Sequence, residues 1–264
     1  ALEALNQVRR FHGGVALALD PDLLDQLEFG AQAQVAVVAK RTIGQAAAQL
    51  ITSGQLVALA AGTTTTQVAL ALRGRENLAI MTNALNIAQD LSREPGIRLT
   101  CAGGEVHGDY YTLTGPVTER ALSAQTYDLA VVGVSGISLE RGFTVNSLSN
   151  AASIGIMLRN ARRRMIVADH SKFGQVSYAF LVELNQVDSL VTDIAPPLPY
   201  RQRFRRWGGV DRGGAGTRLA RATLRGWDGS NGQPHLAGRG CWALRRCASI
   251  GPLAWRFAHA GHNV

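Results

Sequence analysis

Apolar residues in the middle of the chain follow two spacings, one typical of helices and one typical of buried strands. Residues 34–53 place them at steps of three or four before a glycine stop, which predicts an amphipathic helix. Short apolar runs predict strands at 56–60, 78–81, 97–101, 129–134, 165–168 and 189–192, with helices at 66–72, 85–91, 117–123 and 149–161. Near-continuous apolar strands require cover on both faces. We therefore predict an α/β fold, a layered and mostly parallel sheet with helices on both faces.

The two ends of the chain do not continue this alternation. Residues 1–19 predict the end of a helix and a short strand entering a glycine turn, and residues 20–33 are interpreted as a linker. The α/β domain is predicted over 34–210, and residues 211–264 form an Arg-, Gly- and Trp-rich tail.

Composition is typical of a protein with a packed core. The chain has 264 residues, 46% of them hydrophobic, and no apolar run approaches the roughly 18 residues that span a bilayer. No basic start followed by an apolar run marks an export signal, and three cysteines are too few for a disulfide framework. We therefore expect a cytosolic (cytoplasmic) protein without membrane association, and no cofactor is predicted.

Basic charge is confined to the tail. The net charge is +8, but residues 197–264 contribute +10 and residues 1–196 contribute −2. Three interpretations stay open: nucleic-acid binding through arginine and tryptophan, a metal site at Cys241 and Cys247, and a sequence that is not native. The five-residue gap between the cysteines exceeds the usual zinc spacing of about two to four. Arginine without lysine in a glycine-rich stretch is typical of an out-of-frame reading of GC-rich DNA. We favour a non-native or disordered tail and predict no metal site.

Gly62, Thr63, Thr64 and Thr65 form the sharpest candidate site. They lie between a predicted strand and a predicted helix, so free backbone N–H groups and the positive end of the helix dipole point into the loop. The loop lacks the lysine of a nucleotide-binding P-loop and the three glycines of a dinucleotide fingerprint. It therefore favours an anion such as phosphate over ATP or NAD. A threonine N-cap on an ordinary helix gives the same pattern.

Further polar residues follow the other predicted strands. Ligands in such sheets lie at the carboxyl ends of the strands, and the residues that follow strands here are Asn83, Gly104, Glu105, Ser135 and Lys172. Each also fits an ordinary turn. Lysine is nearly absent from the chain, so Lys172 is a candidate counter-charge for an anion at the threonine loop.

Several of these segments together resemble one protein family. Six motifs have the order and spacing of the effector domain of DeoR-type bacterial transcriptional regulators: LAAGTTT at 59–65, MTNALN at 81–86, AGGE at 102–105, LTGP at 113–116, GVSGIS at 133–138 and DHSKFG at 169–174. The match covers about residues 35–193. By the same resemblance, residues 199–207 would form the family's last helix, but the closing strand expected after it is not recognisable, which predicts an open edge on the sheet. In addition, RRFHGG at 9–14 resembles the wing that ends the family's amino-terminal winged helix-turn-helix.

This resemblance implies both a fold and a function. The fold would be similar to ribose-5-phosphate isomerase and glucosamine-6-phosphate deaminase, used as a sensor for a phosphorylated sugar or related metabolite. The loop 62–65 and Lys172 would hold the phosphate, and the rest of the pocket would be lined by Asn83, Gly104, Glu105 and Ser135. Family members are repressors of carbohydrate operons, so operator DNA and a homo-oligomer are the implied partners.

Two departures from the family pattern bear on chemistry. Ala61 stands where the family usually has an acidic residue or serine, and Ser135 stands where it usually has Asp. In the related enzymes an acid near that turn transfers protons, so its loss favours binding over turnover. No catalytic residue is therefore predicted. The alternative is a sugar-phosphate isomerase or deaminase-like enzyme on the same fold.

Recognition of DNA by a helix-turn-helix requires a recognition helix in the major groove. Only the wing is recognisable here, where Arg9, Arg10 and His12 are candidates for phosphate contacts. We therefore expect an amino-terminally truncated family member that keeps the effector half and lacks a complete DNA-binding head.

Overall fold

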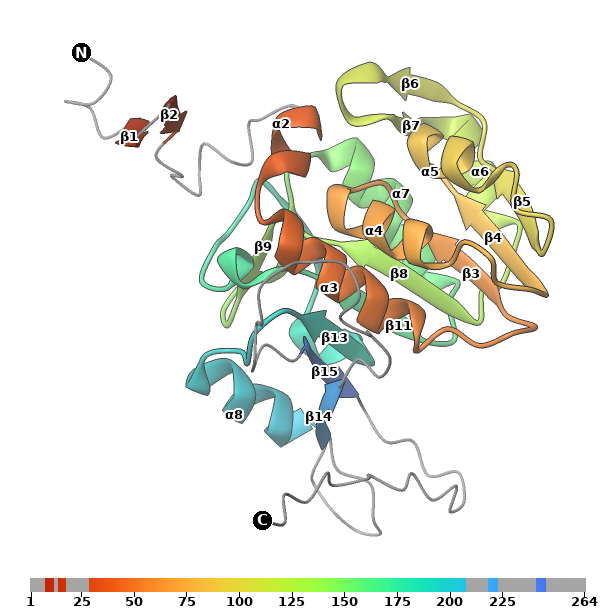
Figure 1. The fold of residues 1–264 in the computed structure, drawn as a ribbon. Helices are drawn as coiled ribbons and strands as arrows, with labels where there is room; N and C mark the ends of the chain where they lie inside the picture. The colour runs from red at the N-terminus through yellow and green to blue at the C-terminus, as the bar shows by residue number, and fades with distance from the viewer. Residues whose placement is uncertain (1–7, 12–13, 18–28, 208–217, 223–240, 246–264) are drawn as a thin grey trace, which may run out of the picture.

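The computed structural model describes residues 8–11, 14–17, 29–207, 218–222 and 241–245, and its central element is one large sheet (Figure 1). Neighbouring strands pair in parallel in the order β13-β11-β8-β3-β4-β5. The bounds are β3 (Leu56–Leu59), β4 (Leu78–Thr82), β5 (Ile97–Cys101), β8 (Leu129–Gly133), β11 (Arg164–Val167) and β13 (Ser189–Thr192). The strand runs predicted from the apolar pattern are confirmed to within two residues, and the predicted fold class is confirmed.

The strand order reverses at the centre of the sheet. From β3 the chain moves outward through β4 to β5, then returns to β8 on the other side of β3 and moves outward through β11 to β13. In open α/β sheets, ligands bind at the carboxyl ends of the strands that flank such a reversal. The topology therefore directs attention to the segments that follow β3 and β8.

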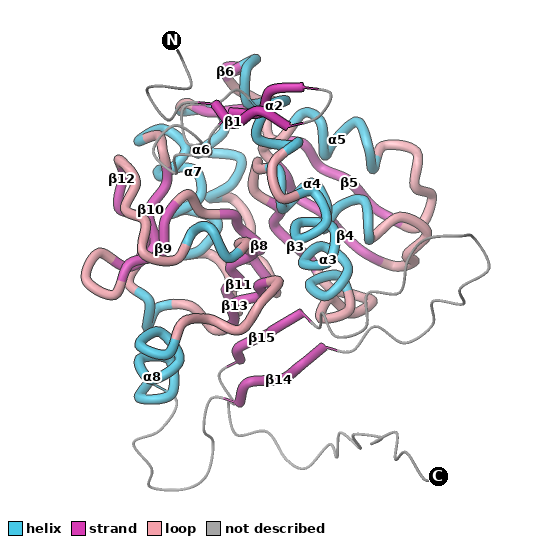
Figure 2. The backbone as a smooth tube through the Cα atoms, turned by 60° about the vertical axis from the view of Figure 1, so that its left-hand side comes forward, coloured by secondary structure: helices cyan, strands magenta, loops and turns pink. Residues whose placement is uncertain are grey.

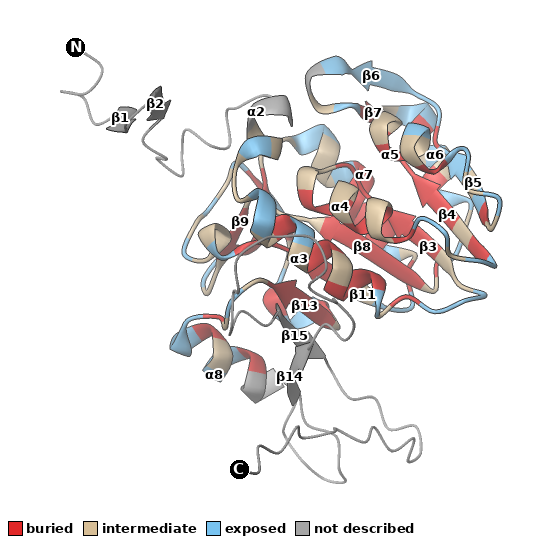
Figure 3. Cartoon of the chain, viewed as in Figure 1, coloured by how far each residue is buried: buried red, intermediate tan, exposed pale blue. Residues whose placement is uncertain are grey.

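Helices cover both faces of this sheet (Figure 2). The first face carries α3 (Val37–Ala48), α4 (Thr63–Ala71) and α5 (Leu85–Leu91), and the second carries α6 (Pro116–Ser123) and α7 (Leu148–Arg159). Alternate residues of a strand point to opposite faces, so Val57 and Leu59 are buried with the first group and Ala58 with the second. Figure 3 shows how completely the central strands are buried between these layers.

Shorter elements complete the fold. The second face also carries an antiparallel sheet of β9 (Gly136–Ser138), β10 (Gly142–Val145) and β12 (Ala179–Val182). The remaining elements are the β6–β7 hairpin (Glu105–His107 and Thr112–Thr114), the 3-10 turns η2 (Gly108–Tyr110), η3 (His170–Lys172) and η4 (Leu184–Gln186), and α8 (Leu198–Trp207). The helix expected at residues 199–207 is present as α8, whereas the strands β6, β7, β9, β10 and β12 were not predicted.

The helix predicted over residues 34–53 is divided in the structure. α2 occupies Phe29–Gln34, mostly within the predicted linker, and α3 begins at Val37. Between them Ala36 has a φ of 52°, a left-handed conformation that ends a helix. The apolar spacing continues through this break, so periodicity does not detect it.

Both ends of the described chain form antiparallel pairs. β1 (Val8–Phe11) and β2 (Gly14–Leu17) pair as a hairpin, where a strand and a glycine turn were predicted. At the other end β15 (Cys241–Arg245) pairs with β13, and β14 (Arg218–Ala222) pairs with β15. The prediction of an open edge at β13 is therefore wrong, because a strand from the tail region occupies it. The helix end predicted at residues 2–5 lies outside the described residues.

Candidate functional site

A cavity of about 200 Å³ lies at the carboxyl ends of β3, β8 and β11. This is the place where the strand order reverses, and where ligands bind in sheets of this type. Its walls come from the loops after these three strands, the start of α7, the β6–β7 hairpin, and the α2–α3 segment. Segments far apart in the sequence therefore converge on one site.

The threonine loop forms one wall of this cavity. Gly62 has a φ of 152°, in the region that favours glycine, and turns the chain from β3 into α4. The hydroxyls of Thr65 and Thr66 both donate to the Gly62 carbonyl, at 2.9 and 2.8 Å. Thr63 and Thr64 line the cavity, and the hydrogen bonds among the described residues involve neither side chain. The first turn of α4, where helical N–H groups have no intrahelical partner, therefore faces the cavity.

Thr65 and Asn83 are predicted site residues that the structure places behind the loop. Both are fully buried and neither lines the cavity. The Ala61 N–H donates to Asn83 Oδ1 at 3.1 Å, and Asn83 Nδ2 donates to the Leu113 carbonyl at 3.2 Å. Asn83 therefore fixes the position of the threonine loop relative to β7.

Lys172 lines the cavity from the turn that follows β11. Within this turn the N–H and the hydroxyl of Ser171 both donate to Asp169 Oδ1. Asp169 is buried and also lines the cavity. At the end of the turn the Gly174 N–H donates to the hydroxyl of Tyr200 on α8, at 2.9 Å. The backbone that carries Lys172 is therefore held at both ends.

Lys40 is a cavity residue that the sequence analysis missed. It lies on the first turn of α3, is 6% exposed, and donates from Nζ to the Gln32 carbonyl at 2.6 Å. Burial lowers the pKa of Lys40 to about 8, while the Asp169 carboxylate raises it and the Lys172 ammonium lowers it. Lys40 and Lys172 are the two lysines of the whole chain, and both line this cavity. The rarity of lysine was the signal that could have identified Lys40.

Uncharged polar side chains supply much of the remaining wall. Ser147 is the N-cap of α7 and accepts a hydrogen bond from the Asn150 N–H at 3.4 Å, and both line the cavity with Ser149. The hairpin adds four more residues, His107, Tyr110, Thr112 and Thr114. Hydroxyl, amide and imidazole groups of this kind pair with neutral hydroxyls. Sequence analysis missed them because they follow no predicted strand.

The other predicted ligand-binding residues have different positions. Ser135 lines the cavity. Glu105 lies on the same face of β6 as His107, but its side chain is exposed and does not line the cavity, and Gly104 before it does not either. The structure thus brings together Gly62, Thr63, Thr64, Ser135 and Lys172, and leaves out Thr65, Asn83, Gly104 and Glu105.

Two of the three predicted DNA contacts belong to the amino-terminal hairpin. Arg9 and Arg10 belong to β1, where they pair with Ala16 and Val15 of β2. Their side chains and the whole of His12 lie outside the described residues.

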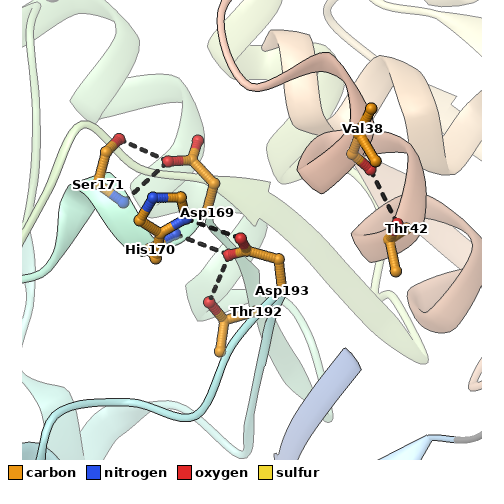
Figure 4. Close-up of polar contacts among 7 residues, drawn as sticks. All are labelled: Val38, Thr42, Asp169, His170, Ser171, Thr192 and Asp193. Carbon is orange, nitrogen blue, oxygen red and sulfur yellow. Dashed lines mark hydrogen bonds and ion pairs between the residues drawn. The ribbon is translucent and has the colours of Figure 1, made fainter. Parts of the chain in front are cut away.

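His170 supports the lysine-bearing turn from outside the cavity. Its ring Nδ1 lies 2.7 Å from Asp193 Oδ2, and its backbone N–H donates to Asp193 Oδ1 at 2.8 Å (Figure 4). Asp193 follows β13, so this pair ties the turn after β11 to the neighbouring strand. Figure 4 also shows the two separate hydrogen bonds from Ser171 to Asp169.

The charges at the cavity suit an anion. The lining side chains include two ammonium groups, Lys40 and Lys172, against the single carboxylate of Asp169. No group of three His, Cys, Asp or Glu side chains within the described ranges is placed to hold a metal ion. In the same ranges, no helix combines the length and the apolar character needed to cross a membrane.

Comparison with known proteins identifies the family. A sequence profile of the DeoR C-terminal sensor domain matches residues 35–194, more than half of the chain. The chain belongs to the DeoR family of transcriptional regulators. The membership predicted from six motifs is therefore confirmed, and the cavity described above lies within the matched DeoR sensor domain.

Several relatives of this DeoR-family chain are named repressors. The chain is 33% identical over 196 residues to the HTH-type transcriptional repressor GlcR of Bacillus subtilis, covering 74% of each protein. It is 30% identical over 197 residues to the glycerol-3-phosphate regulon repressor of Escherichia coli K12, covering 75% of this chain and 77% of the relative. It is 30% identical to a putative aga operon transcriptional repressor of Escherichia coli O157:H7, of which the chain spans 63%.

Among solved structures, ribose 5-phosphate isomerase A of Methanocaldococcus jannaschii is similar with a TM-score of 0.39 and 14% identity, covering 79% of each chain. The α/β fold of the DeoR-family chain rests on its own strand order and register.

Proposed function

We propose that this chain is the sensor part of a DeoR-type repressor and that its cavity binds a phosphorylated sugar or a related phosphorylated metabolite. The observation that carries the proposal is the position of the two lysines. A chain with 27 Lys and Arg residues contains two lysines, and both line the cavity that the N-terminus of α4 faces. Ammonium groups and the N–H groups of a helix start are the donors that bind phosphate in proteins.

The proposed phosphate position is the α4 end of the cavity. Gly62, Thr63 and Thr64 would donate from backbone and hydroxyl groups, and the two ammonium groups would neutralise the charge. The serine, asparagine and threonine side chains of the α7 start and the hairpin would hydrogen-bond the hydroxyls of the sugar. This division of charged and neutral donors supports a sugar phosphate over an unphosphorylated sugar.

We further propose that the cavity binds its effector without turning it over. Ser135 lines the cavity, at a position where the family resemblance leads us to expect Asp. Glu105, the other acid considered from the sequence, does not line the cavity, and Asp169 Oδ1 already accepts two bonds from Ser171. The relatives' names as repressors support the same proposal.

The proposed partners are operator DNA and further copies of the chain. Operator DNA would be bound by the family's winged helix-turn-helix, with Arg9, Arg10 and His12 of the wing at phosphates. Repression by the named relatives supports this partner.

A thermal-shift panel tests the effector. Fructose 6-phosphate, glucose 6-phosphate, ribose 5-phosphate, glycerol 3-phosphate and inorganic phosphate are compared with the unphosphorylated sugars. A compound at 100 times its Kd stabilises the folded state by about 2.7 kcal/mol, a rise in Tm of about 5–10 °C for a chain of this size. The double variant Thr64→Ala/Lys172→Ala should bind at least about 100-fold more weakly, because it loses two donors to a charged group.

The matched control is Thr42→Ala/Arg73→Ala. It removes one threonine hydroxyl and one cation that do not line the cavity, where they bond Val38 and Asp90. Its affinity should equal that of the parent chain. Unchanged Tm for the parent with every phosphorylated compound would reject the effector site. Consumption of any panel compound by the parent chain would instead favour the enzyme alternative.

A further inference from the structure

The Lys40 side chain of α3 links the sensor cavity to the end of α2. Lys40 lines the cavity and, with the same Nζ, donates to the Gln32 carbonyl near the end of α2. The Val35 N–H donates to the same carbonyl at 3.2 Å. A cation bonded to the last carbonyls of a helix stabilises that helix end. Lys40 therefore belongs both to the cavity and to the helix end of α2.

α2 is also the segment that leads from the amino-terminal hairpin into the sensor domain. β2 ends at Leu17, α2 spans Phe29–Gln34, and α3 follows after the left-handed Ala36. α3 packs against α4 so closely that a Cβ on Gly44 would come within 2.5 Å of the Gln67 backbone. α3 is thus fixed to the helix whose N-terminus faces the cavity. A helix of six residues such as α2 depends on its contacts for stability.

We propose that Lys40 couples occupation of the cavity to the docking of α2, by bonding a bound phosphate and the Gln32 carbonyl with one ammonium group. An ammonium has three N–H donors, so both bonds can be made at once. A phosphate in the cavity keeps the ammonium charged and orients it. The hydrogen bond from Lys40 to the Gln32 carbonyl is then stronger when the cavity is occupied than when it is empty. This difference is the differential interaction that coupling requires.

The inference rests on the proposed anion site and adds a route from that site toward the amino-terminal hairpin. Its direction is defined: the anion and the docked state of α2 stabilise one another, and by linkage the docked α2 raises the affinity for the anion. Burial also lowers the pKa of Lys40 to about 8. The charged form of Lys40 is therefore less stable in the empty cavity than beside a bound anion.

Hydrogen exchange on the full chain tests the coupling, with inorganic phosphate as the probe. In the parent chain, saturating phosphate should slow exchange of amides in residues 29–38 about fivefold. Lys40→Met should remove this protection even at saturating phosphate, whereas Lys40→Arg, which keeps a cation, should restore most of it. Lys172→Met is the matched control: it removes the other cavity ammonium, so it weakens phosphate binding but leaves protection of residues 29–38 at saturation.

Each outcome separates the two proposals. No binding of phosphate to the parent chain by calorimetry rejects the anion site, and the coupling with it. Binding with no change in exchange at residues 29–38 rejects the coupling alone. Protection that persists in Lys40→Met also rejects it, because the signal would then pass through direct contact with Gln32, which lines the cavity. Protection lost equally in both methionine variants would show a general loss of cavity order and would overturn the role of Lys40.

Discussion

At the residue scale, the two lysines differ in how far the sequence reveals them. Lys172 follows a buried strand, so the rule that ligands bind at strand ends places it near the threonine loop. In the structure, Lys172 and this loop line the same cavity. Lys40 lies on a helix, next to Arg41, and follows no strand, so that rule does not apply to it. Its long side chain brings the ammonium to the cavity from a neighbouring element.

Asn83 illustrates a second limit at this scale. A polar residue after a strand has the same sequence signature whether it contacts a ligand or the backbone. Here the side-chain amide of Asn83 accepts a hydrogen bond from the Ala61 N–H and donates one to the Leu113 carbonyl. Whether such a residue contacts a ligand or the backbone depends on which residues surround it in the folded structure. The sequence alone does not give these neighbours.

The lowered pKa of Lys40 predicts proton uptake when an anion binds. In the empty site the pKa of Lys40 is about 8, so at pH 8 about half of the Lys40 side chains are neutral. A sugar phosphate is already a dianion at this pH and raises the pKa of the amine, so binding should take up as much as about 0.5 proton. Calorimetry in buffers of different ionisation enthalpy measures the uptake.

Lys40→Arg is the control, because arginine stays charged and takes up no proton. Equal uptake in this variant would contradict the assignment to Lys40. Without ligand, the folded pKa of about 8 lies below the ordinary 10.5. The unfolded chain therefore binds more protons between these values, and the contribution of Lys40 to stability rises with pH across that window.

At the element scale, long periodic segments could be predicted and short or interrupted ones could not. The parallel strands and α5 through α7 follow from apolar runs and helical spacing. The β6–β7 hairpin, which supplies four cavity residues, has no such pattern. The break at Ala36 could not be predicted for another reason. Ala36 has a left-handed backbone conformation, but the apolar residues on either side of it keep the spacing of a helix.

The contact between α3 and α4 predicts the effect of one added methyl group. Gly44→Ala would place a Cβ 2.5 Å from the Gln67 carbonyl carbon, so the two helices must move apart. We expect a loss of about 1–3 kcal/mol in the free energy of unfolding and weaker phosphate binding, since Lys40 and the threonine loop lie on these two helices. Chemical denaturation and calorimetry measure the two effects.

Gly108→Ala is the matched control, because a Cβ there meets no atom within 4 Å. It should leave both stability and binding unchanged. Full stability in Gly44→Ala would mean that the helix pair tolerates a wider spacing, and that the close contact does not fix α3 to α4.

At the scale of the whole molecule, strand order decides where the site lies. The reversal between β3 and β8 brings the loops after β3, β8 and β11 to one edge, and these loops carry the threonines, Ser135 and Lys172. The family resemblance predicted this arrangement, and the pattern of apolar runs predicted the fold class. The edge of the sheet was not predicted, because β15 comes from a segment without strand periodicity.

The central claim is that the start of α4 and the two lysines hold the phosphate of a sugar phosphate. A crystal structure of the chain with the panel compound that gives the largest thermal shift tests it most directly. We expect the phosphate oxygens at hydrogen-bond distance, about 3 Å, from the Thr63–Thr64 backbone and from the ammonium groups of Lys40 and Lys172. A phosphate bound elsewhere, or one in the cavity that touches neither lysine, would contradict it.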